Sequence, residues 1–464
     1  MERLSKVLGF VLAVTASLPL LAQQKHELSI KEAVEMAYKN VIEIKNKELD
    51  YQIQEAQNMG IRGQALPQIT GSAAGQYYYQ LPIFLFPDAT STSVYEILKN
   101  EGVSGAAGPI TNVPQPQLRP VSFQQPWNAN AGATLTQLLF QPDVFVALKA
   151  RSVSLEYARN NVELSKETVK DSAHKRYYAV LIAEKQLGFI NDGVARIEKL
   201  VHDNEIMYQN GFLEKLDVDR AKVQLSNLKT TQTTLKNGIY LSYAALKFAL
   251  GFPQKDSIVL KDTLSIDELK SGILSDEFKY DDRKEFQLLQ TTKQLQLLDL
   301  KRYQLGYIPT VSLVGNYTRQ GQANKFIFTD DEAFWYNTGY FGLNISIPIF
   351  DGLQRRYQVK QSKLKVQQVD NSIEYLKQGI DLEQTVSKES LKNSLLNFDE
   401  QQKNIELAEA VYNTTKKKFE SGLGSSFDII QAENDLQTSQ SNYFQALYEA
   451  IVAKINYQKS VGKL

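Results

Sequence analysis

The stretch that decides the fold occurs twice in this chain. Residues Tyr208–Leu225 read YQNGFLEKLDVDRAKVQL, residues Phe419–Leu436 read FESGLGSSFDIIQAENDL, and the two copies align without a gap. Each copy lies between two long segments whose apolar residues recur at helical spacing. A glycine after a helix favours a left-handed cap, and an acid favours the first turn of the next helix. The repeated stretch therefore predicts the turn at the tip of a long helical hairpin, made twice.

The segments around these turns carry a heptad pattern. Between Pro142 and about Tyr208, apolar residues recur every seventh position, first as Leu148, Leu155, Val162 and Val169. A seven-residue apolar repeat sustained over many turns is typical of coiled-coil packing. At 1.5 Å per residue, this segment would be roughly 100 Å long as a helix. A soluble coiled-coil protein is the alternative reading of the heptads taken alone.

Four shorter segments alternate with period two, as strands do. They run over residues 69–77, 131–140, 310–318 and 341–349, and the last shows the cleanest alternation. The first two are separated by residues 80–126, which are rich in Pro and Gly and read as an irregular connection that is either functional or disordered. Two strands joined by a long loop are typical of a membrane hairpin. The role of the loop is not fixed by its sequence.

The N-terminus has the features of an export signal. Arg3 and Lys6 precede an apolar run, Val7–Leu21, that ends before Gln23. This order of features predicts a cleavable signal peptide over residues 1–22. Beyond it no apolar run is long enough for a membrane-spanning helix, so any membrane crossing must use strands.

Composition excludes several classes of site. Lys plus Arg and Asp plus Glu each number 52, so no net field favours nucleic acid, and no nucleic-acid partner is expected. The chain has no cysteine, which removes disulfides and thiolate metal sites. Its histidines, His26, His174 and His202, lie far apart in the sequence, so we expect no metal site and no cofactor. Glycine-rich phosphate loops, paired catalytic acids and Ser-His-Asp arrangements do not occur in the sequence context that each requires. The chain is therefore not expected to be an enzyme.

The order of segments divides the chain into repeats. Helix, strand, strand, long helix, tip and return helix occupy residues 23–253 and recur in 284–464, with residues 254–283 as the linker between them. Repeats of this kind are counted before domains. The chain is therefore expected to carry an internal two-fold repeat.

Four strands cannot close a barrel, and open sheet edges in hydrocarbon cost several kcal/mol for each unsatisfied group. The protomer is therefore expected to oligomerise. Two copies would give about eight strands with a filled interior, whereas three copies give about twelve and leave an aqueous lumen. We expect a homotrimer.

Aromatic residues cluster at the ends of the predicted strands, as in the two girdles of a membrane barrel. The alternative is a β-sandwich with aromatic strand ends, which does not explain the long helices. The girdle set is Tyr77, Tyr79, Trp127, Phe140, Tyr307, Trp335, Tyr340 and Phe350.

With these parts in order, the chain resembles the TolC-like outer-membrane efflux proteins. The resemblance covers nearly all of the chain after residue 22 and rests on the two tips and on the strand-to-helix junctions LLFQPD and PIFDGLQ. It implies an α+β membrane protein, with a long coiled-coil-like α-helical barrel in the periplasm. The other part would be an antiparallel transmembrane β-barrel in the outer membrane, built from four strands per protomer and 12-stranded as a trimer.

The resemblance also implies partners and tip residues. A periplasmic adaptor (membrane fusion) protein would dock on the tips, an inner-membrane pump would drive export, and outer-membrane lipid would surround the barrel. Carried over by position, Asp217 and Asp428 become candidates for the periplasmic aperture. The candidates for adaptor contact are Gly211, Phe212, Gly422 and Leu423. The alternative is that the glycines only end helices and the acids only begin them. Both residue types would then recur in the two copies without any role in the aperture or in adaptor contact.

The function expected is that of a passive exit duct in a tripartite efflux or type I secretion system. The sequence does not separate export of small molecules from export of proteins. Two other classes stay open: a trimeric adhesin or structural coiled-coil protein, and a diffusion porin.

Overall fold

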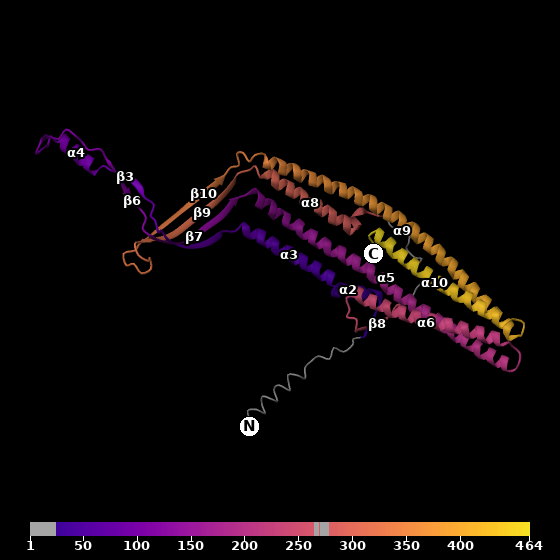
Figure 1. Cartoon of the computed structure of the whole chain (residues 1–464). Coiled ribbons are helices and arrows are strands. Elements are labelled where there is room, and N and C mark those ends of the chain that lie inside the picture. The colour runs from indigo at the N-terminus through magenta and orange to yellow at the C-terminus, as the bar shows by residue number, and fades with distance from the viewer. Residues whose placement is uncertain (1–24, 264–268, 270–277) are drawn as a thin grey trace, which may run out of the picture. The chain divides into compact units, whose positions relative to one another are not determined.

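The computed structural model describes residues 25–263, 269 and 278–464 (Figure 1). The predicted signal peptide and part of the predicted linker lie outside these residues. The chain divides into two compact units. The helical unit comprises the chain up to Ala56, Arg151–Leu297 and Lys363–Leu464, and the strand unit comprises Gln57–Ala150 and Leu298–Ser362. Among the described helices, none is both long enough and apolar enough to cross a membrane.

The strand unit is built on one antiparallel sheet in the order β10-β9-β7-β2. Its strands are β2 (Gln68–Tyr77), β7 (Trp127–Phe140), β9 (Thr310–Ala323) and β10 (Phe334–Ser346). The four strands expected from the alternation therefore form, and the two central ones come from different halves of the sequence. In the described part of the chain, the outer edges of β2 and β10 pair with no further strand.

The sheet has one apolar and one polar face, because successive strand residues point to opposite sides. On β10, the side chains of Phe341, Leu343 and Ile345 are 81%, 64% and 57% exposed. On the other face, Asn316 of β9 donates a hydrogen bond to the Thr134 hydroxyl of β7 at 3.0 Å. A sheet with an exposed apolar face fits hydrocarbon better than water.

One residue of the predicted girdle is misplaced. Tyr340 pairs with Asn316 in the middle of β10, and it points away from the apolar face that Phe341 occupies. The expectation was wrong because β10 already begins at Phe334, well before Tyr340. Tyr77 and Trp127, by contrast, meet at the loop end of the sheet with ring centroids 4.7 Å apart. The girdle made by the other aromatics stays a prediction.

The connection between β2 and β7 is folded, contrary to the irregular loop expected from its Pro and Gly content. We call residues 80–126 the extension. Its elements are β3 (Phe84–Asp88), α4 (Thr90–Asn100), β4 (Ser104–Gly105), β5 (Gly108–Pro109) and β6 (Gln117–Val121). Strands β3 and β6 pair as an antiparallel ribbon. At the start of α4, the Asp88 carboxylate accepts a hydrogen bond from the Thr90 amide at 3.0 Å and forms an ion pair with Arg119, whose Nε lies 2.7 Å away.

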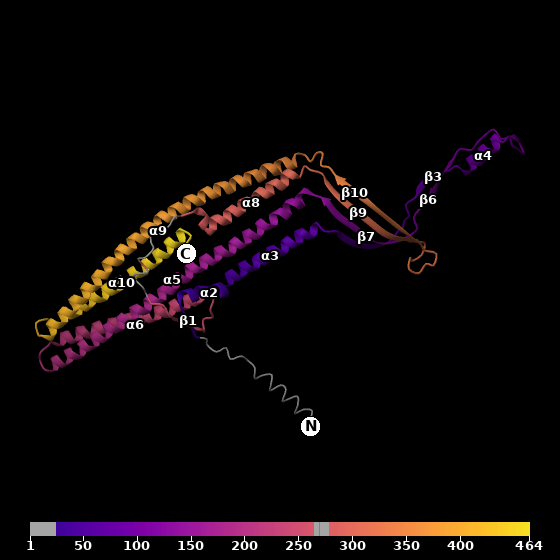
Figure 2. The same ribbon diagram turned by 180° about the vertical axis from the view of Figure 1, so that it is seen from behind.

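Most of the helical unit consists of two long hairpins (Figure 2). They are formed by α5 (Pro142–Gln209) with α6 (Lys215–Leu250), and by α9 (Gln354–Glu420) with α10 (Ser426–Ser460). Helices α5 and α9 have 68 and 67 residues, which corresponds to about 100 Å each. Heptad positions such as Val162, Val169, Val194 and Val201 are buried, as the sevens predicted.

Shorter elements complete the helical unit. They are β1 (Lys25–Leu28), α2 (Ile30–Asn40), α3 (Ile42–Gln64), β8 (Ser257–Leu260), η1 (Tyr280–Asp282) and α8 (Lys284–Leu305). Strands β1 and β8 pair in parallel. The order helix, strand, strand, long helix, return helix occurs in both halves, while the predicted repeat boundaries remain a prediction.

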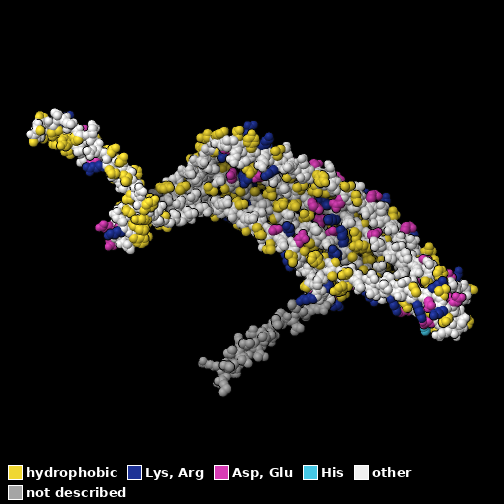
Figure 3. Space-filling view, in the orientation of Figure 1, with side chains coloured by type: hydrophobic (Ala, Val, Ile, Leu, Met, Phe, Trp, Pro, Cys, Tyr) yellow, Lys and Arg dark blue, Asp and Glu magenta, His cyan; other side chains and the backbone are white. Residues whose placement is uncertain are grey.

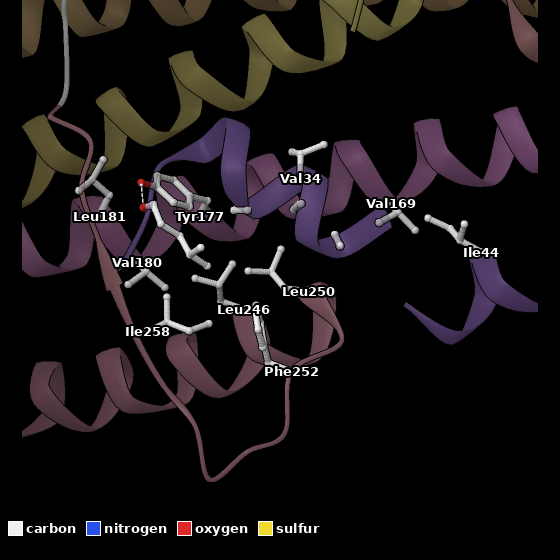
Figure 4. Close-up of a cluster of buried hydrophobic side chains, with 14 residues drawn as sticks. Val34, Ile44, Val169, Tyr177, Val180, Leu181, Leu246, Leu250, Phe252 and Ile258 are labelled. Carbon is white, nitrogen blue, oxygen red and sulfur yellow. Dashed lines mark hydrogen bonds between the residues drawn. The ribbon is translucent and has the colours of Figure 1, made fainter. Parts of the chain in front are cut away.

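A core in the helical unit joins α2, α5, α6 and β8 (Figure 4). Its centre is Tyr177, which is fully buried and donates a hydrogen bond from its hydroxyl to the Leu28 carbonyl at 2.9 Å. Leu246 and Leu250 at the end of α6 pack into the same cluster. This core ties the C-terminal end of α6 to the middle of α5.

Candidate functional site

The two helical turns have the same backbone geometry. Gly211 and Gly422 adopt left-handed φ values of 76° and 75°. After each glycine, the next amide reaches back to the last helical turn: Phe212 N donates to Met207 O, and Leu423 N to Lys418 O, at 2.8 and 2.9 Å. This is the Schellman cap, which glycine makes without steric strain. The glycines end their helices as the sequence predicted, and both views show the turns side by side (Figures 1 and 2).

Each turn displays one large apolar side chain. The residue after the cap glycine commonly packs back on the helix. Here Phe212 is 78% exposed and Leu423 is 84% exposed. The two predicted adaptor-contact positions therefore present apolar surface that the described chain does not cover.

Asp428 is held at the start of α10 by a capping box. Its amide donates a hydrogen bond to Ser425 Oγ at 3.2 Å, and its carboxylate accepts one from the Ser425 amide at 3.1 Å. Hydrogen bonds from the backbone and then the side chain of Ser425 lower the pKa of the Asp428 carboxyl. The carboxylate is solvent-exposed and ionised at neutral pH, so it can attract a cation.

Asp217 lies at the equivalent position of α6 but has different neighbours. Its carboxylate lies 3.7 Å from Arg220 Nη1, and its side chain is 23% exposed. The N-cap residue of α6 is Glu214, whose side chain makes no capping hydrogen bond. The guanidinium of Arg220 partly offsets the negative charge of Asp217 at this turn.

Side chains connect the two turns. Asn204 of α5 is fully buried and donates to Ser426 Oγ at 2.6 Å. The Arg220 guanidinium lies over the Phe427 ring, 5.5 Å from its centroid. The two turns are thus in direct side-chain contact.

A buried ion pair lies on the helices behind the turns. Arg196 of α5 donates from Nε and Nη2 to the two carboxylate oxygens of Glu433 on α10, at 2.8 and 2.7 Å. The Glu433 side chain is 1% exposed, and Arg196 also lies over the Tyr412 ring at 5.3 Å. Burial by itself lowers the pKa of Arg196. The hydrogen bonds to Glu433 and the negative charge of Glu433 outweigh this effect, so the pKa of Arg196 is raised.

This ion pair is not among the contacts predicted from the sequence, although the sequence of α10 carries a signal for it. Ile429, Glu433, Leu436 and Gln440 follow one another at spacings of four, three and four along α10, and all are buried. A charged residue inside a heptad stripe calls for a partner. Which distant residue supplies that partner is not visible in the sequence.

No group of metal-binding side chains occurs among the residues that the structure describes. His26 belongs to β1, His174 to α5 and His202 to the same helix further on. The carboxylates around the turns accept hydrogen bonds from helix caps or pair with arginines. This arrangement attracts cations and holds helices together.

The chain is similar to known export proteins. A family model described as "Outer membrane efflux protein" matches residues 300–463. The outer membrane protein TolC of Vibrio cholerae is 20% identical over 343 residues, which cover 72% of this chain and 77% of the relative.

Solved structures share the fold over nearly the whole chain. CusC, a transmembrane channel, superposes with a TM-score of 0.72 at 14% identity, covering 93% of this chain and 92% of CusC. The outer membrane protein VceC from Vibrio cholerae superposes with a TM-score of 0.68 at 13% identity, covering 93% of this chain and 96% of VceC.

Proposed function

We propose that this chain, a member of the TolC-like outer-membrane efflux protein family, is the outer-membrane exit channel of an export assembly. The family match includes β9, β10 and the second long hairpin. The relatives are channels of the bacterial outer membrane, and we assign this chain to the same membrane and to passive transport without chemistry of its own.

The observation that carries the proposal is the open four-stranded sheet with an apolar face. Its edge strands β2 and β10 are left without partners in the described residues. In a membrane these edges require pairing. Pairing β2 of one copy with β10 of the next closes a ring, and three copies give a barrel of about twelve strands with an aqueous lumen. We propose a homotrimer whose apolar face meets outer-membrane lipid.

Within each copy, we propose that the two repeats, residues 23–253 and 284–464, each contribute two strands and one long hairpin. In a trimer this arrangement brings six turns to one end of a helical tunnel. The segment 254–283 then links the repeats.

The tips are the proposed meeting point with a periplasmic adaptor. Phe212 and Leu423 offer apolar side chains on a turn held rigid by its cap. Exposed apolar side chains on a rigid frame are suited to bury against a partner. The inner-membrane pump would act through this adaptor.

We propose Asp428 as the principal aperture residue, with Asp217 in a secondary role. Asp428 is ionised and exposed, whereas Asp217 stands beside Arg220. Three copies of Asp428 around an axis would form an acidic ring that binds cations and narrows the entrance.

The assembly is tested by native mass spectrometry of the purified full-length protein in detergent. A complex of three chains is expected. A monomer would contradict both the channel and a trimeric adhesin. Solvent-exposed edges in a monomer would also exchange their amide hydrogens quickly, whereas edges paired between copies would be protected.

A further inference from the structure

The ribbon of the extension carries an aromatic face that is exposed to solvent. Phe84 and Phe86 of β3 lie on one side of the ribbon, with the Phe123 ring 6.0 and 6.3 Å from theirs. These side chains are 55%, 56% and 64% exposed. The opposite side of the ribbon carries Leu85 and Leu118. A lone two-stranded ribbon is marginally stable in water, so such a surface indicates a partner.

A second aromatic surface lies in the loop between β9 and β10. Phe326, Phe328 and Phe334 are 47%, 73% and 64% exposed. The Phe326 ring rests against Trp127 at 5.1 Å and against Phe328 at 5.6 Å. We call these three phenylalanines the aromatic loop.

The strand register brings both surfaces to the same end of the sheet, with Phe326 of the aromatic loop reaching back to Trp127 of β7 and Phe328 lying beside Trp335 of the edge strand β10. At this end of the sheet, Tyr77 of β2 pairs with Trp127 of β7, and Trp127 pairs with Ala323 of β9. The neighbouring residue of β9, Gln322, pairs with Phe334 at the start of β10. The extension follows the β2 edge, where the Tyr78 amide donates to the Pro126 carbonyl at 2.8 Å and holds its base. The aromatic loop leads into the β10 edge.

We propose that the aromatic face of one copy's extension packs on the aromatic loop of the neighbouring copy and clasps adjacent subunits together. This contact rests on the proposed ring, in which β2 of one copy lies beside β10 of the next. Two different surfaces then meet at every subunit boundary, as a heterologous contact that closes a ring requires. The extension thereby gives the assembly an apolar contact beyond the strand pairing.

The charges of the extension favour a second copy over a lipid surface. Helices that bind anionic membranes carry Lys and Arg on their polar face. The charged residues of the extension are Asp88, Glu96, Lys99, Glu101 and Arg119. Acids outnumber bases, and Arg119 is already bonded to Asp88. The chain's own opposite edge supplies the complementary aromatic surface.

The first test compares the two sides of the ribbon in the full-length protein. One variant replaces Phe84, Phe86 and Phe123 by Ser, and its matched control replaces Leu85 and Leu118 by Ser. The temperature at which the oligomer dissociates in SDS should fall for the aromatic-face variant and stay at the parent value for the control. A dissociation temperature of the aromatic-face variant equal to that of the parent would overturn the proposal. An equal fall of the dissociation temperature in both variants would also overturn it, and would indicate that lipid surrounds the ribbon.

The second test uses the absence of cysteine from the sequence. The double substitution Phe86→Cys with Phe328→Cys should give disulfide-linked dimers and trimers on oxidation, while Leu85→Cys with Phe328→Cys should not. A crosslink within one chain, or the same ladder in both variants, would overturn the contact. A monomeric parent would overturn the proposed function as well, whereas an oligomeric parent without the crosslink overturns the contact alone.

Discussion

Arg196 on α5 and Glu433 on α10 form a bidentate ion pair, 2.8 and 2.7 Å between the bonded atoms, that ties one helical hairpin to the other. Gly193 makes room for it, since a Cβ there would lie 3.1 Å from Glu433 Oε1. The pair is buried in the apolar cluster that joins α5, α6, α9 and α10 behind the turns. It therefore holds α5 and α10 together behind the two turns.

Replacing Glu433 by Ala should destabilise the helical unit strongly. The substitution leaves the half-buried Arg196 guanidinium, whose side chain is 26% exposed, without its charged partner, which typically costs about 1–3 kcal/mol. Helical circular dichroism during unfolding of the purified protein would report the loss. The double variant Arg196→Met with Glu433→Leu should recover most of it, because an apolar pair of similar size removes the buried charge. A double variant as unstable as the single one would contradict this account.

Acid should weaken the helical unit through His174. Burial, together with the charge of Lys170, lowers the pKa of His174 from 6.5 to about 4, against the opposing charge of Asp171. Between these two values the unfolded chain binds more protons, so stability is full above about 6.5 and is lost as the pH falls toward 4. The loss should be on the order of 2 kcal/mol.

The variant His174→Gln should flatten this dependence, measured as the unfolding midpoint between pH 7 and pH 4. His202→Gln is the matched control, since His202 is exposed on the same helix. An identical slope in the parent and in His174→Gln would show that other groups cause the acid sensitivity.

Gly132 should not tolerate a side chain. A Cβ at this position of β7 would lie 2.5 Å from Thr318 Oγ1 and 2.6 Å from the Tyr317 carbonyl on β9. Gly132→Ala should therefore push two central strands apart and cost about 1–3 kcal/mol. Gly342→Ala, where no described atom lies within 4 Å, is the control. Equal yields of folded, heat-resistant protein for both variants would contradict the close approach.

Leu423 should contact the adaptor. A photo-crosslinking amino acid at this exposed tip position should capture a periplasmic adaptor protein in intact cells, identified by mass spectrometry. The same amino acid at Tyr375, which is 81% exposed but lies along α9 away from the turn, should capture none. Capture of the adaptor from both positions, or from Tyr375 alone, would contradict docking at the tips.

Much of the fold could be predicted because its signals are local. The cap glycines, the heptads from Val162 to Val201 and the period-two strands each follow from spacing along the chain. The extension could not be predicted, because its strands are short and rich in proline, and the pairing of β3 with β6 spans about thirty residues that include helix α4. Tyr340 was misassigned because an alternating pattern fixes the face of a residue only once the strand ends are known.

The site was predicted in part for the same reason. Gly422 predicts the end of one helix, and Asp428 predicts the start of the next. The pairing of Arg196 with Glu433 depends on how α5 and α10 meet in space, which spacing along one helix does not encode. Likewise, only the folded turn shows Arg220 beside Asp217.

Single-channel conductance in planar lipid bilayers tests the central claim most directly. The parent protein should conduct poorly, with a current that divalent cations reduce further, because the ring of ionised Asp428 carboxylates narrows the entrance. Asp428→Ser should raise the conductance and weaken the divalent block. A parent that conducts freely, with conductance and divalent block unchanged by Asp428→Ser, would contradict an exit channel closed at its tips.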